Sequence, residues 1–149
     1  GMGGHNAGEV ASRLAVETLT AFIHRSAEDT DFSWPYGLDK TLSFEGNRLR
    51  TGISLANRRV FRAAESTDDY GGMGTTIVGL LVNGAKIAVG HVGDSRLYLL
   101  SNNQLEQLTY DDSWAIVVNI FCPFTIQSSP SRTARVDAAA MSEPESGSE

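Results

Sequence analysis

Residues 75–92 read T-T-I-V-G-L-L-V-N-G-A-K-I-A-V-G-H-V and indicate most clearly what kind of fold the chain adopts. Residues 75–82 and 86–92 are rich in β-branched and large apolar side chains, which is typical of two strands. Asn83-Gly84 lies between them, and this dipeptide favours the type I′ turn that joins neighbouring antiparallel strands. The stretch therefore predicts a β-hairpin.

Two further strands are expected after this hairpin. Gly93-Asp94-Ser95 and Asn102-Asn103 are turn sequences, and residues 96–100 and 104–108 again favour β-structure. Short turns between consecutive strands predict an antiparallel meander. Because the strands are apolar on much of both faces, we expect helices on one side and another layer on the other.

Two amphipathic helices are expected before the strands. Apolar side chains recur at helical spacing over residues 7–25 and again over about residues 47–65. Asn6 and Asn47 stand where the N-caps of these helices are expected. Residues 26–40 contain Pro, Gly and Asp and are interpreted as a loop. The predicted fold class is therefore α+β.

The composition excludes several classes of protein. The 149 residues are enough for one domain, and no apolar run approaches the ~20 residues that cross a bilayer. The formal net charge of -6 disfavours binding to nucleic acid or to anionic membranes, and it suits recruitment of divalent cations. With a single cysteine, Cys122, and no secretory leader, we expect a cytoplasmic protein that binds neither nucleic acid nor membrane.

The character of the sequence changes after residue 114. Residues 115–124 form a short apolar run without clear alternation, and residues 125–149 are rich in Ser, Ala, Pro and Glu. Such a composition buries too little apolar surface to fold. We therefore expect a domain over residues 1–114 and a divergent, disordered tail over residues 115–149.

Three residues are candidates for a metal or phosphate site. Gly1 opens a glycine-rich stretch where a ligand can approach the backbone closely, and His5 carries an imidazole that can bind metal or act as an acid. Asp94 lies in a turn between two strands, where a carboxylate can reach a hard cation. Each feature also has a plainer interpretation, namely a loop entering a helix and an Asx turn. The residues alone leave both interpretations open, as they do for the acidic pair Asp111-Asp112.

Four segments taken together resemble a known family. They are G-M-G-G-H-N-A-G-E-V-A-S at 1–12, G-G-M-G-T-T at 71–76, H-V-G-D-S-R at 91–96 and L-T-Y-D-D-S-W at 108–114. In this order and spacing they resemble bacterial members of the metal-dependent phosphatase 2C-like family of protein serine/threonine phosphatases. The resemblance is specific because four separate motifs agree, and it covers about residues 1–114.

The resemblance implies both a fold and a chemistry. The fold would be part of an α/β/β/α sandwich, in which antiparallel sheets are flanked by antiparallel helices. The chemistry would be hydrolysis of phosphoserine or phosphothreonine in proteins by water activated at a binuclear Mn²⁺ or Mg²⁺ centre. By position in the motifs, Gly1 would bind a metal through its carbonyl, His5 would be the catalytic general acid, and Asp94 would be a ligand of a further metal.

The chain also departs from the family pattern. The family has a bridging metal-binding Asp directly before the residue that matches Gly1, and further metal-binding Asp residues beyond the part that matches residues 108–114. Asp112 stands where the family usually has His. We therefore expect this chain, as a fragment, to hold divalent metal poorly and to be a weak or inactive phosphatase by itself.

The expected partner is a phosphoprotein, such as a substrate of a bacterial serine/threonine kinase. Sheet edges that lack a neighbouring strand also predict self-association. Two alternatives to an active enzyme stay open: a non-catalytic phosphatase-like interaction module, and a truncated gene product without an independent role. Capture of a partner without metal dependence would favour the module.

Overall fold

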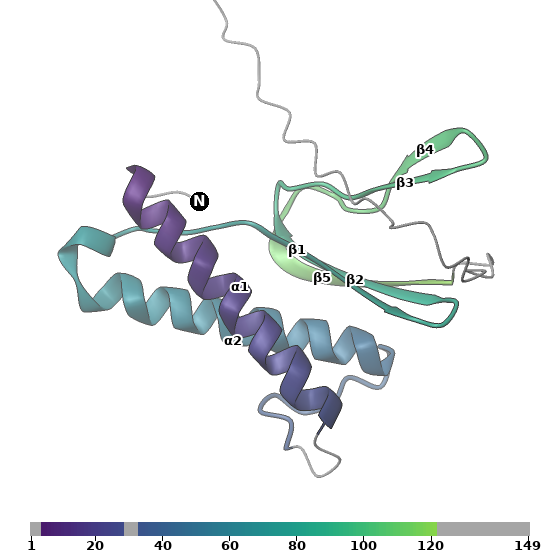
Figure 1. Ribbon diagram of the computed structural model, residues 1–149, viewed down its shortest axis with the longest axis horizontal. Coiled ribbons are helices and arrows are strands. Elements are labelled where there is room, and N and C mark those ends of the chain that lie inside the picture. Colours follow the sequence, from purple (N-terminus) through teal and green to yellow (C-terminus); the bar gives the residue numbers. More distant parts are fainter. Residues whose placement is uncertain (1–3, 29–32, 122–149) are drawn as a thin grey trace, which may run out of the picture.

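The computed structural model describes residues 4–28 and 33–121 of the chain (Figure 1). The helices of this part are α1 (Gly4–Glu28), α2 (Phe44–Ser66) and the short 3-10 helix η1 (Asp68–Tyr70). The strands are β1 (Ile77–Asn83), β2 (Lys86–Gly93), β3 (Tyr98–Ser101), β4 (Gln104–Gln107) and β5 (Asp112–Phe121). None of the helices described is both long and apolar enough to pass through a membrane.

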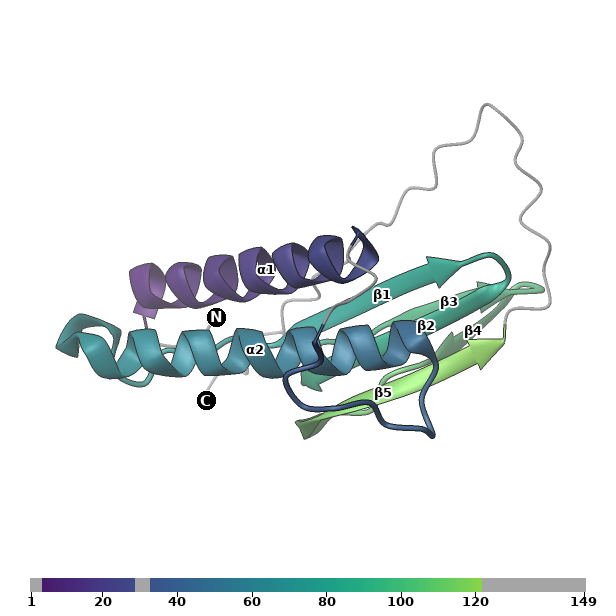
Figure 2. The same ribbon diagram turned by 90° about the horizontal axis from the view of Figure 1, so that it is seen from below.

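The elements are arranged in three layers (Figures 1 and 2). α1 and α2 form an antiparallel pair, and α2 packs against all three strands of an antiparallel sheet with the order β1-β2-β5. The β3–β4 hairpin lies on the side of this sheet that faces away from the helices. The structure therefore confirms the predicted α+β class, with antiparallel sheets and antiparallel helices.

Small side chains hold the helix pair together. Ala7, Ala11 and Ala15 of α1 are buried in one cluster with Ala56 and Val60 of α2. Because alanine side chains are short, the two helices approach closely along this line. The apolar periodicity seen in the sequence thus marks the faces that the helices bury against each other.

Glycine allows α2 to pack closely on α1 and on the sheet. A Cβ on Gly52 would overlap the side chain of Leu19, and one on Gly79 of β1 would lie 3.0 Å from Cδ2 of Leu49. Leu49 is itself only 1% exposed. Side chains of α2 such as Leu49 therefore fill the interior between α2 and the sheet, where they pack against the glycine backbone of β1.

The second helix begins earlier than the sequence predicts. Its N-cap is Ser43, whose hydroxyl accepts a hydrogen bond from the backbone N–H of Gly46 at 3.0 Å. The expected cap, Asn47, is buried inside the helix and holds the preceding loop, since it accepts from the N–H of Asp39 at 2.7 Å and donates to the Asp39 carbonyl at 2.9 Å. The prediction was wrong because serine caps a helix as well as asparagine does, and the side chain of Asn47 is used to hold the preceding loop.

The turn between β1 and β2 lies one residue later than predicted. Asn83 still pairs with Lys86, so the two central residues are Gly84 and Ala85. Gly84 has a φ of 58° and is the first of them, whereas a type I′ turn needs positive φ at both central positions. The predicted hairpin is confirmed, whereas the predicted position and type of its turn were wrong.

The strands do not form the single meander that was expected. β2 pairs with β1 and β5, while β3 and β4 pair with each other in a separate sheet. The register of β2 with β5 shifts between His91 and Gly93, and Gly93 has a φ of 92°. This left-handed conformation turns the chain away from the sheet after β2, so the next strand starts a new hairpin.

β5 also crosses the predicted domain boundary. It pairs with β2 from Lys86 opposite Phe121 to Gly93 opposite Asp112. The expected end of the domain at residue 114 therefore falls within a paired strand, because a short apolar run without alternation cannot be assigned by periodicity alone. The rest of the predicted tail, residues 122–149, lies outside the described residues.

Candidate metal centre

Asp94 stands at the end of β2, on the loop of residues 94–97 that leads to β3. Its side chain is exposed and makes no hydrogen bond or ion pair with the residues that the structure describes. A carboxylate with both oxygens available is the ligand that hard divalent cations prefer. The Asp94 carboxylate is therefore free to take a ligand, and its role as a metal ligand stays a prediction.

Gly93 fixes the direction in which the loop leaves the sheet. Its φ of 92° lies in the left-handed region, and a Cβ at this position would lie 2.5 Å from Cγ2 of Thr76. Both the backbone conformation and the contact therefore require glycine here. The residue before Asp94 is consequently held against the segment that leads into β1.

A hydrogen bond holds the residue after Asp94. The hydroxyls of Thr76 and Ser95 are 2.6 Å apart. Thr76 belongs to G-G-M-G-T-T and Ser95 to H-V-G-D-S-R, so two of the segments that carry the family resemblance meet at this point. Asp94 is thus anchored on both sides while its own carboxylate stays unengaged.

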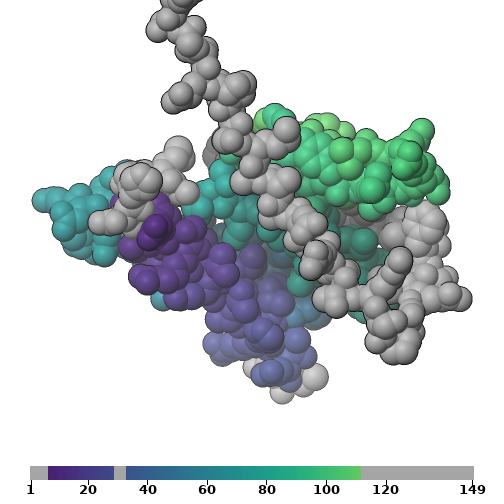
Figure 3. All heavy atoms as spheres, turned by 45° about the horizontal axis from the view of Figure 1, so that its top comes forward, coloured from purple at the N-terminus to yellow at the C-terminus, as the bar shows by residue number. Residues whose placement is uncertain are grey.

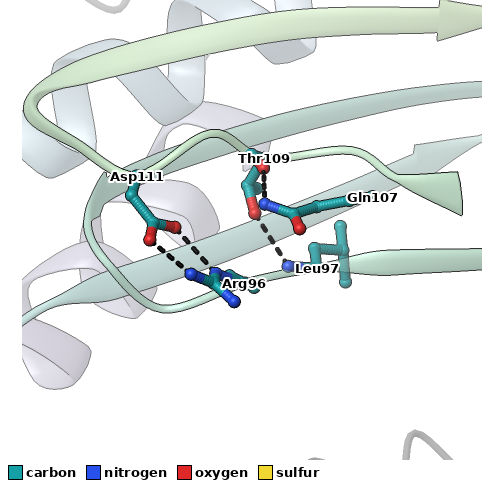
Figure 4. Close-up of polar contacts among 5 residues, drawn as sticks. All are labelled: Arg96, Leu97, Gln107, Thr109 and Asp111. Carbon is teal, nitrogen blue, oxygen red and sulfur yellow. Dashed lines mark hydrogen bonds and ion pairs between the residues drawn. The ribbon is translucent and has the colours of Figure 1, made fainter.

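Arg96 forms an ion pair with Asp111, which lies just before β5 (Figure 4). Nε of Arg96 donates to Oδ1 of Asp111 at 2.8 Å, and Nη2 donates to Oδ2 at 2.6 Å. These hydrogen bonds lower the pKa of the Asp111 carboxyl below its usual value, and the positive charge of Arg96 lowers it further. Asp111 is therefore ionised and fully engaged by Arg96.

Thr109 connects the residue before β3 to the chain segment before β5 (Figure 4). Its side chain is buried, and its hydroxyl accepts a hydrogen bond from the backbone N–H of Leu97 at 2.9 Å. Gln107 donates to the Thr109 carbonyl at 2.5 Å. The loop that carries Asp94 is thus tied to the chain segment before β5 as well as to the start of β1.

His91 is a buried residue that the sequence did not indicate as part of a site. It is 1% exposed, and neither ring nitrogen has a hydrogen-bond partner among the described residues. An imidazole left in this state costs free energy, so its position on β2 is notable. The available signal was a histidine within an otherwise apolar strand, but nothing local distinguished it from the surrounding core residues.

The other two predicted site residues are placed only in part. Gly1 lies outside the described residues, and the structure describes only the backbone of His5. α1 begins at Gly4, so His5 and Asn6 lie inside the helix rather than in a turn before it. The expected Asn6 cap was therefore wrong: the first four N–H groups of a helix have no intrahelical partner, and a helix can extend past a residue of good capping type. Whether Gly1, His5 and Asp94 meet stays a prediction.

The described residues fit one ligand position of a divalent metal and not a complete centre. Among the described side chains of residues 7–28 and 33–111, no group of three or more His, Cys, Asp or Glu could hold a metal ion. Asp94 offers a carboxylate of suitable chemistry, whereas both oxygens of Asp111 are engaged by Arg96. Mg²⁺ commonly takes only one or two protein carboxylates beside water and phosphate, so a single position on this loop is consistent with such a cation.

Comparison with known sequences gives a consistent result. The model of the family described as Protein phosphatase 2C matches residues 1–142. The serine/threonine phosphatase stp of Listeria welshimeri is 40% identical over an alignment of 120 residues that covers 76% of this chain and 41% of that protein. The serine/threonine protein phosphatase PstP of Mycobacterium tuberculosis is 36% identical over 114 residues, or 76% of this chain and 20% of that one. The chain thus spans well under half of these relatives.

Solved structures agree with the sequence comparison. The serine/threonine phosphatase PstP/Ppp of Mycobacterium tuberculosis superimposes with a TM-score of 0.57 at 35% identity, over 74% of this chain and 41% of that one. The catalytic domain of PstP in complex with two manganese ions gives a TM-score of 0.56 at 32% identity, over 74% of this chain and 42% of that one.

Proposed function

Because the chain belongs to the protein phosphatase 2C family, we propose that it forms part of a metal-dependent phosphatase that hydrolyses phosphoserine and phosphothreonine in proteins. The relatives it matches are serine/threonine phosphatases, and one related catalytic domain holds two manganese ions. The observation that carries the proposal is Asp94, an exposed carboxylate without a partner on a loop held on both sides.

The proposal gives each predicted site residue a role. Asp94 and the backbone carbonyl of Gly1 contribute ligands to Mn²⁺ or Mg²⁺, and His5 gives a proton to the oxygen that leaves the phosphate. When bound, the cations neutralise phosphate charge and lower the pKa of a coordinated water. The N-terminus of a helix favours anions, which supports a role for His5, a residue of the first turn of α1, toward a phosphate.

The proposal extends to organisation, substrate and location. Residues 1–114 are part of the catalytic domain, to which the β5 strand adds residues up to 121. The substrate is a phosphoprotein, such as one modified by a bacterial serine/threonine kinase, and the protein acts in the cytoplasm. Free strand edges in the described sheets support self-association as a further property.

The test is Mn²⁺-dependent hydrolysis of a phosphothreonine peptide by the protein that contains this chain. Asp94→Asn should raise the Mn²⁺ concentration needed for half-maximal rate by at least about tenfold, because loss of even indirect metal contacts commonly costs that much. The matched control is Glu28→Gln, at the exposed end of α1, which should leave the rate unchanged. An unchanged Mn²⁺ requirement in Asp94→Asn would contradict the proposal.

A separate assay concerns the 149 residues by themselves. We expect them to hydrolyse an aryl phosphate only weakly, since the described part of the chain contains no group of three or more side chains that could hold a metal ion. Rapid Mn²⁺-dependent turnover that His5→Ala abolishes would contradict this expectation.

The β3–β4 hairpin favours a second candidate function, that of an interaction module. Leu100 and Leu105 face each other across the hairpin and are 68% and 67% exposed. In Figure 3 the green atoms of this hairpin gather on the side of the molecule away from the purple and blue atoms of the helices. This role predicts that the chain binds a phosphoprotein without metal. Leu100→Lys should abolish this binding, whereas Asp94→Asn should retain it.

A further inference from the structure

Arg96 is a potential competitor of the proposed cation for the carboxylate of Asp94. It lies two positions after Asp94 on the same loop. Because consecutive Cα atoms are only ~3.8 Å apart, a residue two positions away lies within the reach of a long arginine side chain. A guanidinium pairs readily with a carboxylate through two parallel hydrogen bonds. An arginine free to pair with Asp94 would occupy the carboxylate and add positive charge where a cation has to bind.

The structure directs Arg96 elsewhere. Its Nε and Nη2 both donate to Asp111, and no described residue pairs with Asp94. The residues on either side of Arg96 are also fixed by hydrogen bonds. The Ser95 hydroxyl is hydrogen-bonded to that of Thr76, and the Leu97 N–H donates to the Thr109 hydroxyl. The backbone is therefore anchored so that the guanidinium meets Asp111 and leaves the Asp94 carboxylate open.

Stability alone gives little reason for this pair. The side chains of Arg96 and Asp111 are 50% and 42% exposed. Ion pairs with this exposure usually stabilise a fold only slightly, because water screens the charges and two long side chains lose freedom. The larger consequence of the pair is where it places the positive charge relative to Asp94.

We propose that Asp111 is a positioning residue that holds Arg96 away from Asp94, so that the Asp94 carboxylate stays available to a divalent cation. In this role Asp111 acts through Arg96 and does not touch the metal itself. The inference rests on the proposed function of Asp94 as a cation ligand. It gives the L-T-Y-D segment a role in the site that the residues alone did not reveal.

Three variants separate this role from the alternatives, with Mn²⁺ affinity, which we expect to be weak but measurable, determined by water proton relaxation on the 149-residue chain. Asp111→Asn releases Arg96, so Mn²⁺ binding should weaken by roughly three- to tenfold. Arg96→Gln removes the competitor and should bind Mn²⁺ at least as tightly as the unsubstituted chain. The double variant, Asp111→Asn with Arg96→Gln, should return to within about twofold of the unsubstituted chain, because additivity fails for coupled residues.

A second readout follows the guanidinium directly. In Asp111→Asn the Nε–Hε resonance of Arg96 should shift in ¹H–¹⁵N spectra, and adding Asp94→Asn should shift it again as the new partner is lost. Asp111→Glu keeps the charge and should rescue Mn²⁺ affinity. These spectra also report whether each variant is folded.

Each other result overturns the inference in a recognisable way. If the double variant binds as weakly as Asp111→Asn, then Asp111 is itself a ligand. If all three variants bind equally weakly, the pair only maintains the loop, and if Asp111→Asn binds normally, Arg96 does not compete. If the unsubstituted chain binds no Mn²⁺, the proposed function of Asp94 fails together with this inference, whereas the preceding results leave that function intact.

Discussion

Arg96 and Asp111 are joined by two hydrogen bonds of 2.8 Å and 2.6 Å, which connect the loop after β2 to the segment before β5. The two residues are fifteen positions apart in the sequence. Because Asp94 is on the same loop as Arg96, this pair lies next to the proposed cation ligand. The geometry of the site therefore depends on contacts between segments that are remote in sequence.

The pair predicts a defined dependence on pH. Hydrogen bonds from Arg96 hold the pKa of Asp111 below its usual value of ~3.9. A carboxyl with a lower pKa in the folded state stabilises the fold above the unfolded value and loses this contribution as the pH falls through the folded value. The carboxyl ¹³C shift of Asp111 should therefore titrate below pH ~3.9, and Arg96→Gln should move its midpoint upward. A midpoint that Arg96→Gln leaves in place would contradict the pairing.

Gly93→Ala should destabilise the fold by about 2–4 kcal/mol. Two effects add up here, because alanine would have to adopt a positive φ and its Cβ would lie too close to Thr76. The control is Gly84→Ala, because Gly84 also has positive φ but a Cβ there meets nothing within 4 Å. That control should cost only about 1 kcal/mol. Urea unfolding of both variants measures the difference, and equal losses would show that the contact with Thr76 is unimportant.

Asn47→Ala should lower the free energy of unfolding by about 2–3 kcal/mol, because partly buried backbone groups of the preceding loop and of the N-cap residue lose their partners. The Asn47 amide donates to the carbonyls of Asp39 and Ser43, and its oxygen accepts from the N–H of Asp39. The exposed Asn57 on the same helix is the matched control, and Asn57→Ala should change stability by less than about 0.5 kcal/mol. A small effect at both positions in urea unfolding would remove the role assigned to Asn47.

Self-association through the β3–β4 hairpin should depend on its exposed leucines. Replacing Leu100 and Leu105 with Lys places charges on a directly paired position of this hairpin, and charged edges resist strand-to-strand pairing. Light scattering should show a larger mean mass for the unsubstituted chain than for the double variant at the same concentration. A monodisperse monomer before substitution would contradict the expected self-association.

Local sequence patterns predicted the helices and the β1–β2 hairpin, because apolar spacing and a Gly-containing turn act over a few residues. They also placed Asp94 correctly at a strand end. The pairing of β2 with β5 and that of Arg96 with Asp111 were not predictable, since both join remote segments. Likewise, the choice of Ser43 over Asn47 as the helix cap depends on the loop that Asn47 holds.

The central claim is that Asp94 binds a divalent cation, and it can be tested by adding Mn²⁺ to ¹⁵N-labelled protein. A bound paramagnetic ion broadens nearby amide signals, so the signals of residues 93–97 should weaken first. Asp94→Asn should abolish this selective broadening, while Glu28→Gln should retain it. Equal broadening of residues 93–97 in Asp94→Asn, or broadening confined to other acidic residues, would contradict the claim.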